Sequence, residues 1–366
     1  MKFETDGFAL AGIPKGARVA VAMSGGVDSS VVAALMHKEG YQVVGITLQL
    51  YDHGEAIQKT KTCCAGQDIY DARRVSEKIG FHHYVLDYES IFKEEVIDDF
   101  ADSYLRGETP IPCVQCNQKI KFRDLLRTAR DLDCAALVTG HYVQNINGEL
   151  HQAHDPSRDQ SYFLFSTKQQ DLNYLRFPLG GIPKSQTRIL AEEFGLEIAN
   201  KPDSQDICFV PNGNYAQTVA KLRPEALIAG DIVNLDGKIL GQHQGIIHYT
   251  IGQRRGLGIA SVDPLYVVAL DPIHNQVIVG PRSALAVTHI PVQDVNWFVD
   301  LSKYPCGFYC TVKVRSTGAA LSAKVQMIDE SHALVTLDQP EYGVSSGQAC
   351  VFYDGTRVIG GGWIKR

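Results

Sequence analysis

The feature that most constrains the fold is a polar loop between an apolar run and a helical pattern near the start of the chain. Residues 17–23 (ARVAVAM) predict a buried β-strand, and residues 29–39 place apolar side chains at helical spacing. Between them lies SGGVDSS (24–30), whose adjacent glycines permit a tight turn. Backbone N–H groups of such a turn, at the start of a helix, converge on an anion. The loop therefore predicts a phosphate-binding site.

The first half of the chain alternates short β-branched runs with helical stretches. This order is typical of an α/β domain in which helices cover both faces of a parallel sheet. Residues 106–117 contain two prolines and a glycine and predict a loop, and Asn147-Gly148 predicts a hairpin turn. Further strands are expected at 41–50, 82–88 and 134–142, and further helices at 66–79, 91–105 and 118–130.

The pattern changes after about residue 212 to short alternating strands separated by glycine turns, which favours β-barrels. A second break near Pro281 to Pro291 suggests two small β-rich domains. We therefore expect a catalytic domain at 1–212, a central β-rich domain at 213–283 and a C-terminal β-barrel at 284–366.

Composition bounds the function classes. None of the 366 residues belongs to an apolar run long enough to span a bilayer, and the N-terminus lacks a signal-peptide pattern, so we expect a cytoplasmic protein without a membrane partner. The net charge of -6 argues against nonspecific coating of nucleic acid. Nine cysteines, an odd number, do not suggest a disulfide framework and direct attention to reactive or metal-binding thiols.

SGGVDSS lacks the terminal Gly-Lys-Ser/Thr of a Walker motif and is not a Rossmann glycine fingerprint. It resembles the loop of the N-type ATP pyrophosphatases, which cleave ATP between the α and β phosphates and adenylate an oxygen of the substrate. The resemblance implies an ATP site with Mg²⁺, in which Asp28 orients the metal or the loop. The implied ATP contacts are Ala22, Met23, Ser24, Gly25, Gly26, Val27, Asp28, Ser29, Leu48 and Gly140.

Further motifs resemble the tRNA-specific 2-thiouridylase family over essentially the whole chain. The resemblance implies an adenine nucleotide α hydrolase-like (Rossmann-like) catalytic domain followed by two β-rich domains. It also implies that ATP activates the 2-oxygen of the wobble uridine, which sulfur then replaces. The motifs are TPIPCVQCNQKIKF (109–122), TGHY (139–142), SRDQSYFL (157–164), KPDSQDICFV (201–210), SSGQACVFYDG (345–355) and GGGW (360–363).

The resemblance assigns the sulfur chemistry to two cysteines. Cys208 carries a persulfide and Cys116 is the partner nucleophile, and a cellular reductant resets their disulfide after turnover. Many family members have aspartate where this chain has Cys113, which leaves an acid–base role for that position in doubt. Cys113, Cys116 and Cys208 together suggest an alternative, a [4Fe–4S] cluster with one open iron. Zinc is a weaker alternative, because the adjacent pair Cys63-Cys64 suits shared metal ligation poorly.

The resemblance also implies contacts with the anticodon stem-loop of tRNA and a persulfide donor protein or relay as a second partner. Thiolation at C2 requires an unstacked base, as in an anticodon loop. The implied contacts are Ile111, Pro112 and Cys113 with the target base, and His141, Arg158, Asp159, Gln160, Arg315, Ser316 and Gln348 with the rest of the tRNA. The helix at 118–130 carries further lysines and arginines that suit phosphates.

Two rival readings stay open at the level of sequence. The ATP loop also fits a synthetase that attaches an amine to a small substrate, for which Cys116 and Cys208 would be dispensable. A tRNA-binding or sulfur-relay module that has lost catalysis is the other reading, and the intact loop speaks against it.

Overall fold

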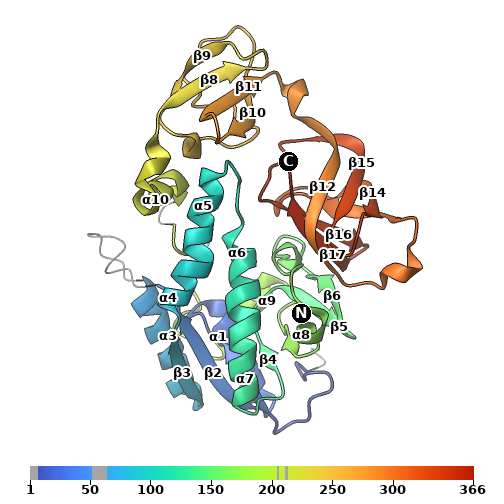
Figure 1. The fold of residues 1–366 in the computed structure, drawn as a ribbon. Helices are drawn as coiled ribbons and strands as arrows, with labels where there is room; N and C mark the ends of the chain where they lie inside the picture. Colours follow the sequence, from blue (N-terminus) through green and yellow to red (C-terminus); the bar gives the residue numbers. More distant parts are fainter. Residues whose placement is uncertain (1–6, 52–63, 204–205, 211–212) are drawn as a thin grey trace. The chain divides into compact units, whose positions relative to one another are not determined.

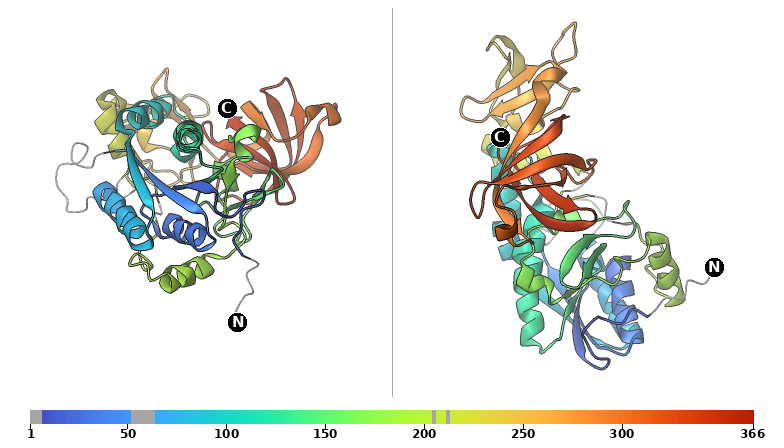
Figure 2. Two further views of the ribbon diagram at one scale, coloured as in Figure 1. Left: turned by 90° about the horizontal axis from the view of Figure 1, so that it is seen from below. Right: turned by 90° about the vertical axis from the view of Figure 1, so that its right-hand side faces the viewer.

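The computed structural model describes residues 7–51, 64–203, 206–210 and 213–366 (Figures 1 and 2). The chain divides into two compact units, which we describe separately. The first comprises Met1–Glu95, Gln115–Gln205 and Thr356–Val358, and the second comprises Val96–Val114, Asp206–Gly355 and Ile359–Arg366.

The first unit is built on a five-stranded sheet with the order β3-β2-β1-β4-β7, in which every neighbouring pair is parallel. The predicted parallel-sheet class is therefore confirmed. Strand β1 has β2 on one side and β4 on the other, so the order of the strands reverses at β1. In parallel sheets, the connections at such a reversal run to opposite sides of the sheet, and a crevice forms between them at the carboxyl ends of the strands. The strands are β1 (Arg18–Ala22), β2 (Gln42–Gln49), β3 (His82–Asp87), β4 (Leu137–Val138) and β7 (Leu175–Arg176).

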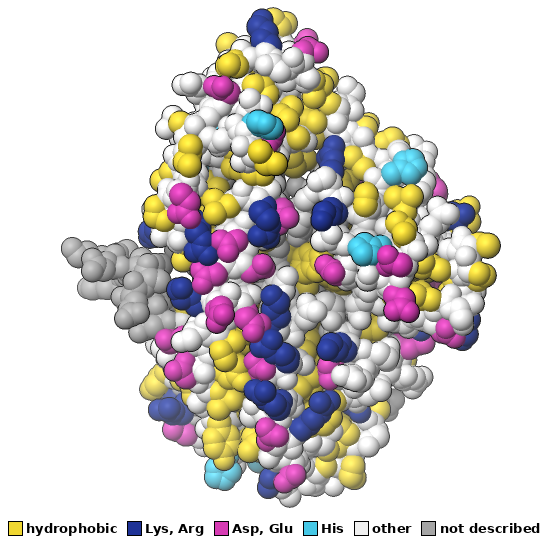
Figure 3. Space-filling model, in the orientation of Figure 1, with side chains coloured by type: hydrophobic (Ala, Val, Ile, Leu, Met, Phe, Trp, Pro, Cys, Tyr) yellow, Lys and Arg dark blue, Asp and Glu magenta, His cyan; other side chains and the backbone are white. Residues whose placement is uncertain are grey.

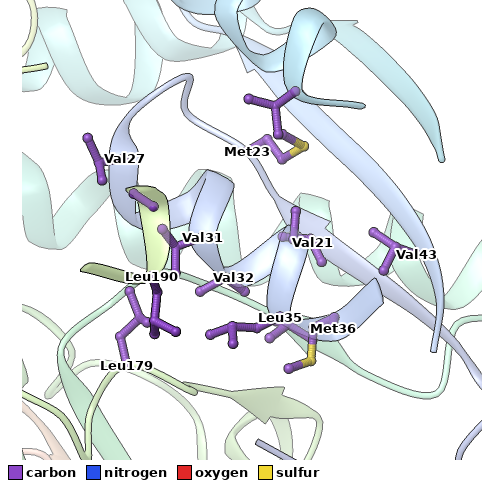
Figure 4. Close-up of a cluster of buried hydrophobic side chains, with 14 of the residues drawn as sticks. Val21, Met23, Val27, Val31, Val32, Leu35, Met36, Val43, Leu179 and Leu190 are labelled. Atoms are coloured by element: carbon purple, nitrogen blue, oxygen red, sulfur yellow. The ribbon is translucent and has the colours of Figure 1, made fainter. Parts of the chain in front are cut away.

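Helices cover both faces of this sheet (Figure 2). On one face, apolar side chains from α1, α3 and α9 pack on Val19, Val21 and Val43 (Figure 4). This core fixes the start of α1 against the sheet and so positions the loop that precedes it. The helical segments among the described residues of the unit include α1 (Val27–Lys38), α3 (Cys64–Ile79), α4 (Glu89–Phe92), the π-helical η2 (Cys116–Leu125), α7 (Leu126–Asp131), the 3₁₀-helical η3 (Ser161–Phe163), α8 (Gln169–Leu172) and α9 (Lys184–Glu193).

A hairpin in this unit confirms the predicted turn. Strands β5 (Val143–Ile146) and β6 (Glu149–Gln152) are antiparallel, and Ile146 pairs with Glu149 across a two-residue turn. Asn147 and Gly148 have φ of 54° and 85°, the positive values that a type I′ turn requires.

The second unit contains two β structures, as the change in pattern after residue 212 predicts. The smaller is a four-stranded sheet of order β10-β11-β8-β9. The larger has the order β12-β15-β14-β13-β16-β17, and pairing of β12 with β17 closes it into a six-stranded barrel. The strands are β8 (Gly230–Asn234), β9 (Ile239–His243), β10 (Tyr266–Asp271), β11 (Gln276–Gly280), β12 (Ala286–Trp297), β13 (Phe308–Lys313), β14 (Leu321–Met327), β15 (Ala333–Tyr342), β16 (Ala349–Asp354) and β17 (Arg357–Ile364).

One local prediction is wrong, and the structure refines two others. Part of the loop predicted at 106–117 is helical, since α6 spans Pro112–Gln115 and η2 begins at Cys116. Pro112 is the first residue of α6, a position where the N–H that proline lacks would have no partner within the helix. The break near 281–291 ends earlier, because β12 runs through Pro291, whose carbonyl accepts a hydrogen bond from the Lys365 N–H. Helix α10 (Tyr215–Leu222) lies in the region predicted to be β-rich.

Helices α5 (Asp99–Leu105) and α10 of the second unit support the segment around Cys208. Helices η1 (Lys93–Asp98) and α5 precede α6. Phe100 of α5 and Val219 of α10 form a buried cluster with Val210. This cluster is the local core on which residues 206–210 rest.

Candidate active site

The loop between β1 and α1 has the geometry of an anion site. Gly25 has φ of 72°, and a Cβ at this position would lie 2.1 Å from the Asp68 carbonyl oxygen, so only glycine fits. Helix α1 starts after Gly26 without a side-chain cap. Its first N–H groups therefore remain available for a ligand, at the positive end of the helix dipole. Ser24 and Ser29 brace the turn, with 3.1 Å between the Ser24 nitrogen and the Ser29 Oγ.

The other predicted ATP contacts lie beside this loop, at the carboxyl ends of neighbouring strands. Gly140 follows β4, and a Cβ there would lie 3.0 Å from the Ser29 nitrogen, so this glycine permits close approach. Leu48, near the end of β2, is half-buried. Met23 and Val27 are buried in the core, so they can offer a nucleotide mainly their backbone. Ala22 ends β1 and completes the group of predicted residues.

Asp28 is the centre of a partly buried polar network. Lys184 Nζ lies 2.6 Å and 2.8 Å from the two carboxylate oxygens of Asp28, and 2.8 Å from Asp203. The Tyr142 hydroxyl hydrogen-bonds to Asp28 at 2.9 Å. The Lys184 side chain is only 8% exposed, so its charge depends on these carboxylates.

Asp203 also receives two arginines, with Arg158 at 3.0 Å and Arg188 at 3.1 Å. Burial alone would raise the pKa of Asp203, but the hydrogen bond and charge of Lys184, together with the arginines, outweigh it and lower the pKa. The network of Asp28, Asp203, Lys184, Arg158 and Arg188 thus holds two carboxylates and three cations. Lys184, which lies beside the loop, can turn from these carboxylates to an anion that enters it.

A second lysine contacts the loop from the other side. Lys201 Nζ donates to the Gly25 carbonyl at 3.0 Å and pairs with Asp68 at 2.7 Å and Asp71 at 2.6 Å. Burial lowers the pKa of Lys201, but its hydrogen bonds to the two aspartates prevail, so the pKa is raised. Sequence reasoning did not single out Lys184, Lys201 or Asp203. The only signal was that KPD (201–203) opens the motif quoted for Cys208.

Cys116 is a free cysteine and is buried, at 7% exposure, at the start of η2. Cys116 belongs to the loop predicted at 106–117, and its buried helical position corrects that prediction. Burial raises the pKa of the Cys116 thiol, and the positive charge of Lys121 offsets part of the increase. Lys121 is held nearby by the side chain of Asn117, whose Oδ1 accepts its hydrogen bond at 3.0 Å.

His141 directly follows Gly140 in the loop after β4. Its ring packs between Phe122 and Phe177, and its Nδ1 is 2.9 Å from the Thr139 hydroxyl. Burial, followed by the charge of Lys121, lowers the pKa of His141 to about 3. The ring is therefore neutral at physiological pH and acts through hydrogen bonds and not as a cation.

Cys113 and Cys208 are exposed. Residues Ile207 and Phe209, on either side of Cys208, pack against the α5–α10 cluster, so the cysteine projects between two anchored neighbours. Asp206 reinforces the segment, because its Oδ1 accepts hydrogen bonds from the Ile207 N–H at 2.8 Å and the Tyr215 hydroxyl at 2.6 Å. Partial burial and Asp206 raise the pKa of Tyr215 to about 12.

The predicted tRNA-contact residues of the first unit are engaged within the protein. Arg158 pairs with Asp203. Asp159 accepts hydrogen bonds from the N–H groups of Ala153 and Ser161, both at 3.1 Å. The side-chain oxygen of Gln160 accepts from the Tyr142 N–H at 2.8 Å. These bonds order the loop after the hairpin, and tRNA contact by these residues stays a prediction.

In the second unit, Ile111 and Pro112 are buried and Cys113 is exposed. Gln348 lies against this loop, because its Nε2 donates to the Thr109 carbonyl at 2.9 Å. On the barrel, Ser316 is half-buried, and Arg315 is exposed and pairs with Glu341 at 2.6 Å. Contacts of these residues with RNA stay predictions.

Within the described ranges, no group of three or more histidine, cysteine, aspartate or glutamate side chains gathers as a metal site would require. Cys63 lies outside the described residues, as does the side chain of Cys64. Nor does any helix in the described part of the chain have the length and apolar character needed to cross a membrane.

Lysines and arginines gather over helices η2 and α7, with acidic side chains beside them (Figure 3). Arg123 pairs with Glu95 at 3.0 Å, and Arg130 pairs with Asp171 at 3.3 Å. The predicted basic helix is therefore present, and part of its charge is already matched by carboxylates.

Comparison with known families assigns all three parts of the chain. Residues 17–212 match a model described as the tRNA methyl transferase HUP domain. Residues 216–281 match the tRNA methyl transferase PRC-barrel domain, and residues 287–364 match the aminomethyltransferase beta-barrel domain.

Full-length relatives are more specific. The chain is 60% identical over 367 residues to the tRNA-specific 2-thiouridylase MnmA of Rhodospirillum centenum, covering 96% of this chain and 93% of the relative. It is 57% identical to the protein of the same name from Rickettsia felis, covering 96% and 98%. A 4-thiouridine synthetase–RNA complex with bound ATP aligns at 19% identity and a TM-score of 0.38, covering 57% of this chain and 51% of that one. Because of its identity to the full-length relatives, this chain belongs to the tRNA-specific 2-thiouridylase family.

Proposed function

We propose that this protein is an ATP-dependent tRNA sulfurtransferase that converts the wobble uridine of tRNA to 2-thiouridine, with release of AMP and pyrophosphate. The observation that carries the proposal is 60% identity to a 2-thiouridylase over 96% of the chain. The glycine loop at the crevice of the parallel sheet supports the proposal, because this chemistry needs a site for a nucleoside triphosphate.

ATP occupies the loop formed by residues 22–29, with Leu48 and Gly140 near its adenosine. The uncapped N–H groups of α1 and the ammonium groups of Lys184 and Lys201 beside the loop support this placement. The uridine O2 attacks the α-phosphorus, and pyrophosphate leaves. The O2–AMP ester turns a poor leaving group into a good one.

Sulfur arrives as a persulfide on Cys208, delivered by a donor protein or relay. The terminal sulfur of the persulfide attacks C2, and AMP leaves with the former O2. The uridine is then joined to Cys208 through a disulfide, C2–S–S–Cys208. The Cys116 thiolate then attacks the Cys208 sulfur, forming a Cys116–Cys208 disulfide and freeing the sulfur on C2 as 2-thiouridine. The two cysteines supply the two electrons, and a thiol reductant restores them.

The burial of Cys116 places one requirement on this sequence. A buried thiol with a raised pKa is a poor nucleophile, so tRNA binding must expose Cys116 or bring charge that stabilises its thiolate. Lys121 is suited to that role. The base-contacting loop at Ile111, Pro112 and Cys113 must open in the same event, because its first two residues are buried.

Two metal questions follow from the resemblance. Magnesium, when bound with ATP, neutralises phosphate charge; Asp28 fits as a ligand only if Lys184 moves, because Lys184 contacts both of its oxygens. A [4Fe–4S] cluster on Cys113, Cys116 and Cys208 does not fit the state described here, in which Cys116 is buried and the other two are exposed. We therefore route no step through a cluster.

The domain boundaries belong to the proposal as well: catalysis at 1–212, a central domain at 213–283, and tRNA binding by the barrel at 284–366. The anticodon stem-loop meets His141, Arg158, Asp159, Gln160, Arg315, Ser316 and Gln348. The cytoplasm, where tRNA is modified, is the proposed location.

The test is to incubate the protein with ATP, Mg²⁺, a persulfide donor and unmodified tRNA, and to analyse the nucleosides by mass spectrometry. We expect 2-thiouridine from the wild type and none from Cys208→Ser or Cys116→Ser. A methylated nucleoside would instead support a tRNA methyltransferase, as the family models are described. Activity of the cysteine variants on a small amine acceptor would support a synthetase. Absence of any product, both in air and under anaerobic conditions that protect a cluster, would refute the proposal.

A further inference from the structure

A loop of the four-stranded sheet carries two adjacent arginines, Arg254 and Arg255, whose side chains are exposed. The loop connects η6 (Ile246–His248) with β10 and lies wholly within the second unit. Neither guanidinium group has a hydrogen bond or an ion pair with any residue that the structure describes. By contrast, Arg223 and Arg315 of the same unit pair with carboxylates at 2.7 Å and 2.6 Å. The charges of the two loop arginines are therefore free to meet a ligand.

The loop is anchored on both sides of these arginines. Before them, the Gln253 carbonyl accepts from the Val267 N–H at 2.9 Å, and the Gln253 side chain donates to the Arg255 carbonyl at 3.0 Å. After them, Leu257 is buried with Val267 in the core of the four-stranded sheet. Gly256, between the arginines and this anchor, has φ of 76°, which lets the chain turn inwards. The protein thus holds the backbone that presents the arginines, so a ligand does not have to order it.

The backbone of the loop also offers hydrogen-bond donors. Over residues 254–260, the N–H groups have no partner among the described residues. Most of these residues are exposed, so an anion can replace the water at their N–H groups without breaking a bond inside the protein. Arg254, Gly258 and Ser261 line a pocket of about 420 Å³. A guanidinium group and free N–H groups at one pocket suit the oxygens of a phosphate.

One acidic residue, Asp263, lines the same pocket. Its side chain is exposed and forms no ion pair with Arg254 or with any other residue that the structure describes. The Asp263 carboxylate repels a free phosphate ion, but it accepts hydrogen bonds, and the 2′-hydroxyl of a ribose can donate one. A pocket with donors for a phosphate and an acceptor for a hydroxyl group therefore suits a ribose–phosphate unit of RNA better than an inorganic anion.

We propose that the loop at residues 254–263 binds a ribose–phosphate unit of the tRNA backbone and gives the central domain an RNA contact of its own. This inference rests on the proposed function, which makes tRNA the substrate. The contact involves no base edge, so it holds the tRNA without reading its sequence. Because the same contact is made before and during the reaction, it contributes to affinity and leaves the chemical step unchanged.

The test measures binding of unmodified tRNA by fluorescence anisotropy over a series of salt concentrations. Arg254→Gln and Arg255→Gln should each weaken binding about threefold or more at about 0.1 M salt and lower the slope of log affinity against log salt by about one. Arg254→Lys, which keeps the charge, should keep the slope. Lys238→Gln is the matched control, because it removes the same charge from an exposed turn of the same sheet, and it should bind tRNA like the wild type.

Two further measurements make each outcome decisive. In the thiolation assay, the glutamine variants at the two arginines should raise the KM for tRNA and leave kcat within about twofold of the wild type. Calorimetry should show that they bind an ATP analogue, uncleavable between the α and β phosphates, as tightly as the wild type does.

The inference is refuted if both glutamine variants bind tRNA like the wild type, or if Lys238→Gln weakens binding as much as they do. A loss of affinity for the ATP analogue in place of tRNA would assign the loop to a free nucleotide and would also refute it. If the wild type itself binds no tRNA, the proposed function fails, which is a different result from a failure of the variants to weaken binding.

Discussion

Replacing His141 with phenylalanine should remove a loss of stability that the wild type suffers in mild acid. The imidazole packs between Phe122 and Phe177, with ring centroids 5.9 Å and 6.4 Å away, so a phenyl ring can keep most of this packing. What the variant loses is the hydrogen bond with Thr139 and a titrating group whose pKa is lowered from 6.5 to about 3 by burial and by Lys121.

The direction of the effect follows from linkage. Above pH 6.5 neither the folded nor the unfolded protein protonates His141, so the residue adds no pH dependence. Between 6.5 and about 3 the unfolded chain binds a proton that the folded protein cannot bind, so the free energy of unfolding falls as the pH falls. The loss is about 1.4 kcal/mol per pH unit, which gives about 2 kcal/mol at about pH 5. The ring is half-buried, so solvent makes this figure an upper bound.

The variant should therefore cross the wild type. Loss of the Thr139 hydrogen bond costs about 1 kcal/mol at every pH, so the wild type is more stable at about pH 7. At about pH 5 the linkage loss of the wild type exceeds that cost, and His141→Phe becomes the more stable protein by up to about 1 kcal/mol.

Urea unfolding at about pH 7, 6 and 5 measures this crossing. Far-UV circular dichroism follows the helices, most of which belong to the first unit. The two tryptophans, Trp297 and Trp363, both lie in barrel strands, so their fluorescence follows the second unit and should not distinguish the variants. Parallel stability curves for the two proteins would refute the reasoning, as would an NMR titration that places the His141 pKa near 6.5.

Two further predictions concern the loop and the cysteines. Gly25→Ala and Gly12→Ala both introduce a Cβ at positive φ, 72° and 74°, which costs about 1 kcal/mol of stability, but only the Cβ at position 25 collides with the Asp68 carbonyl. Only Gly25→Ala should therefore abolish ATP binding, as measured by calorimetry. Equal binding by the two variants would contradict the steric argument. In the absence of tRNA, Cys208 should react with iodoacetamide at least about tenfold faster than the buried, high-pKa Cys116; similar rates in peptide mass spectrometry would show that Cys116 is already accessible.

Sequence patterns predicted the parallel sheet because its strands are continuous apolar runs, and the hairpin because Asn147-Gly148 has few conformations to choose from. They failed at Pro112, where proline was taken as a loop signal although it can also begin a helix. The difference matters for the site, since that helix leads directly into η2, where Cys116 is buried at the first position. Local composition could not distinguish these outcomes, because the burial comes from residues distant in sequence.

The network around Asp28 was beyond sequence reasoning for the same physical reason. Lys184 lies 156 residues after Asp28, at the first position of a helix whose spacing carries no sign of chemistry. The glycine loop could be read from sequence because its constraint is local: a positive φ and a helix that starts without a cap. The counter-charges of that loop depend on how α9 packs against α1, and only the tertiary structure determines this.

The charge balance of the chain bears on how it would select its RNA. A net charge of -6 repels a polyanion at long range, so binding depends on local cations such as those of η2 and α7. Arg123 and Arg130 are already paired with Glu95 and Asp171. If a phosphate displaces either carboxylate from its arginine, the carboxylate stays nearby and repels the phosphate. Each such contact therefore contributes less than an unpaired arginine would. An acidic protein with matched arginines gains little from backbone charge alone, so its discrimination among RNAs must come from the shape of the loop and from contacts to the unstacked base.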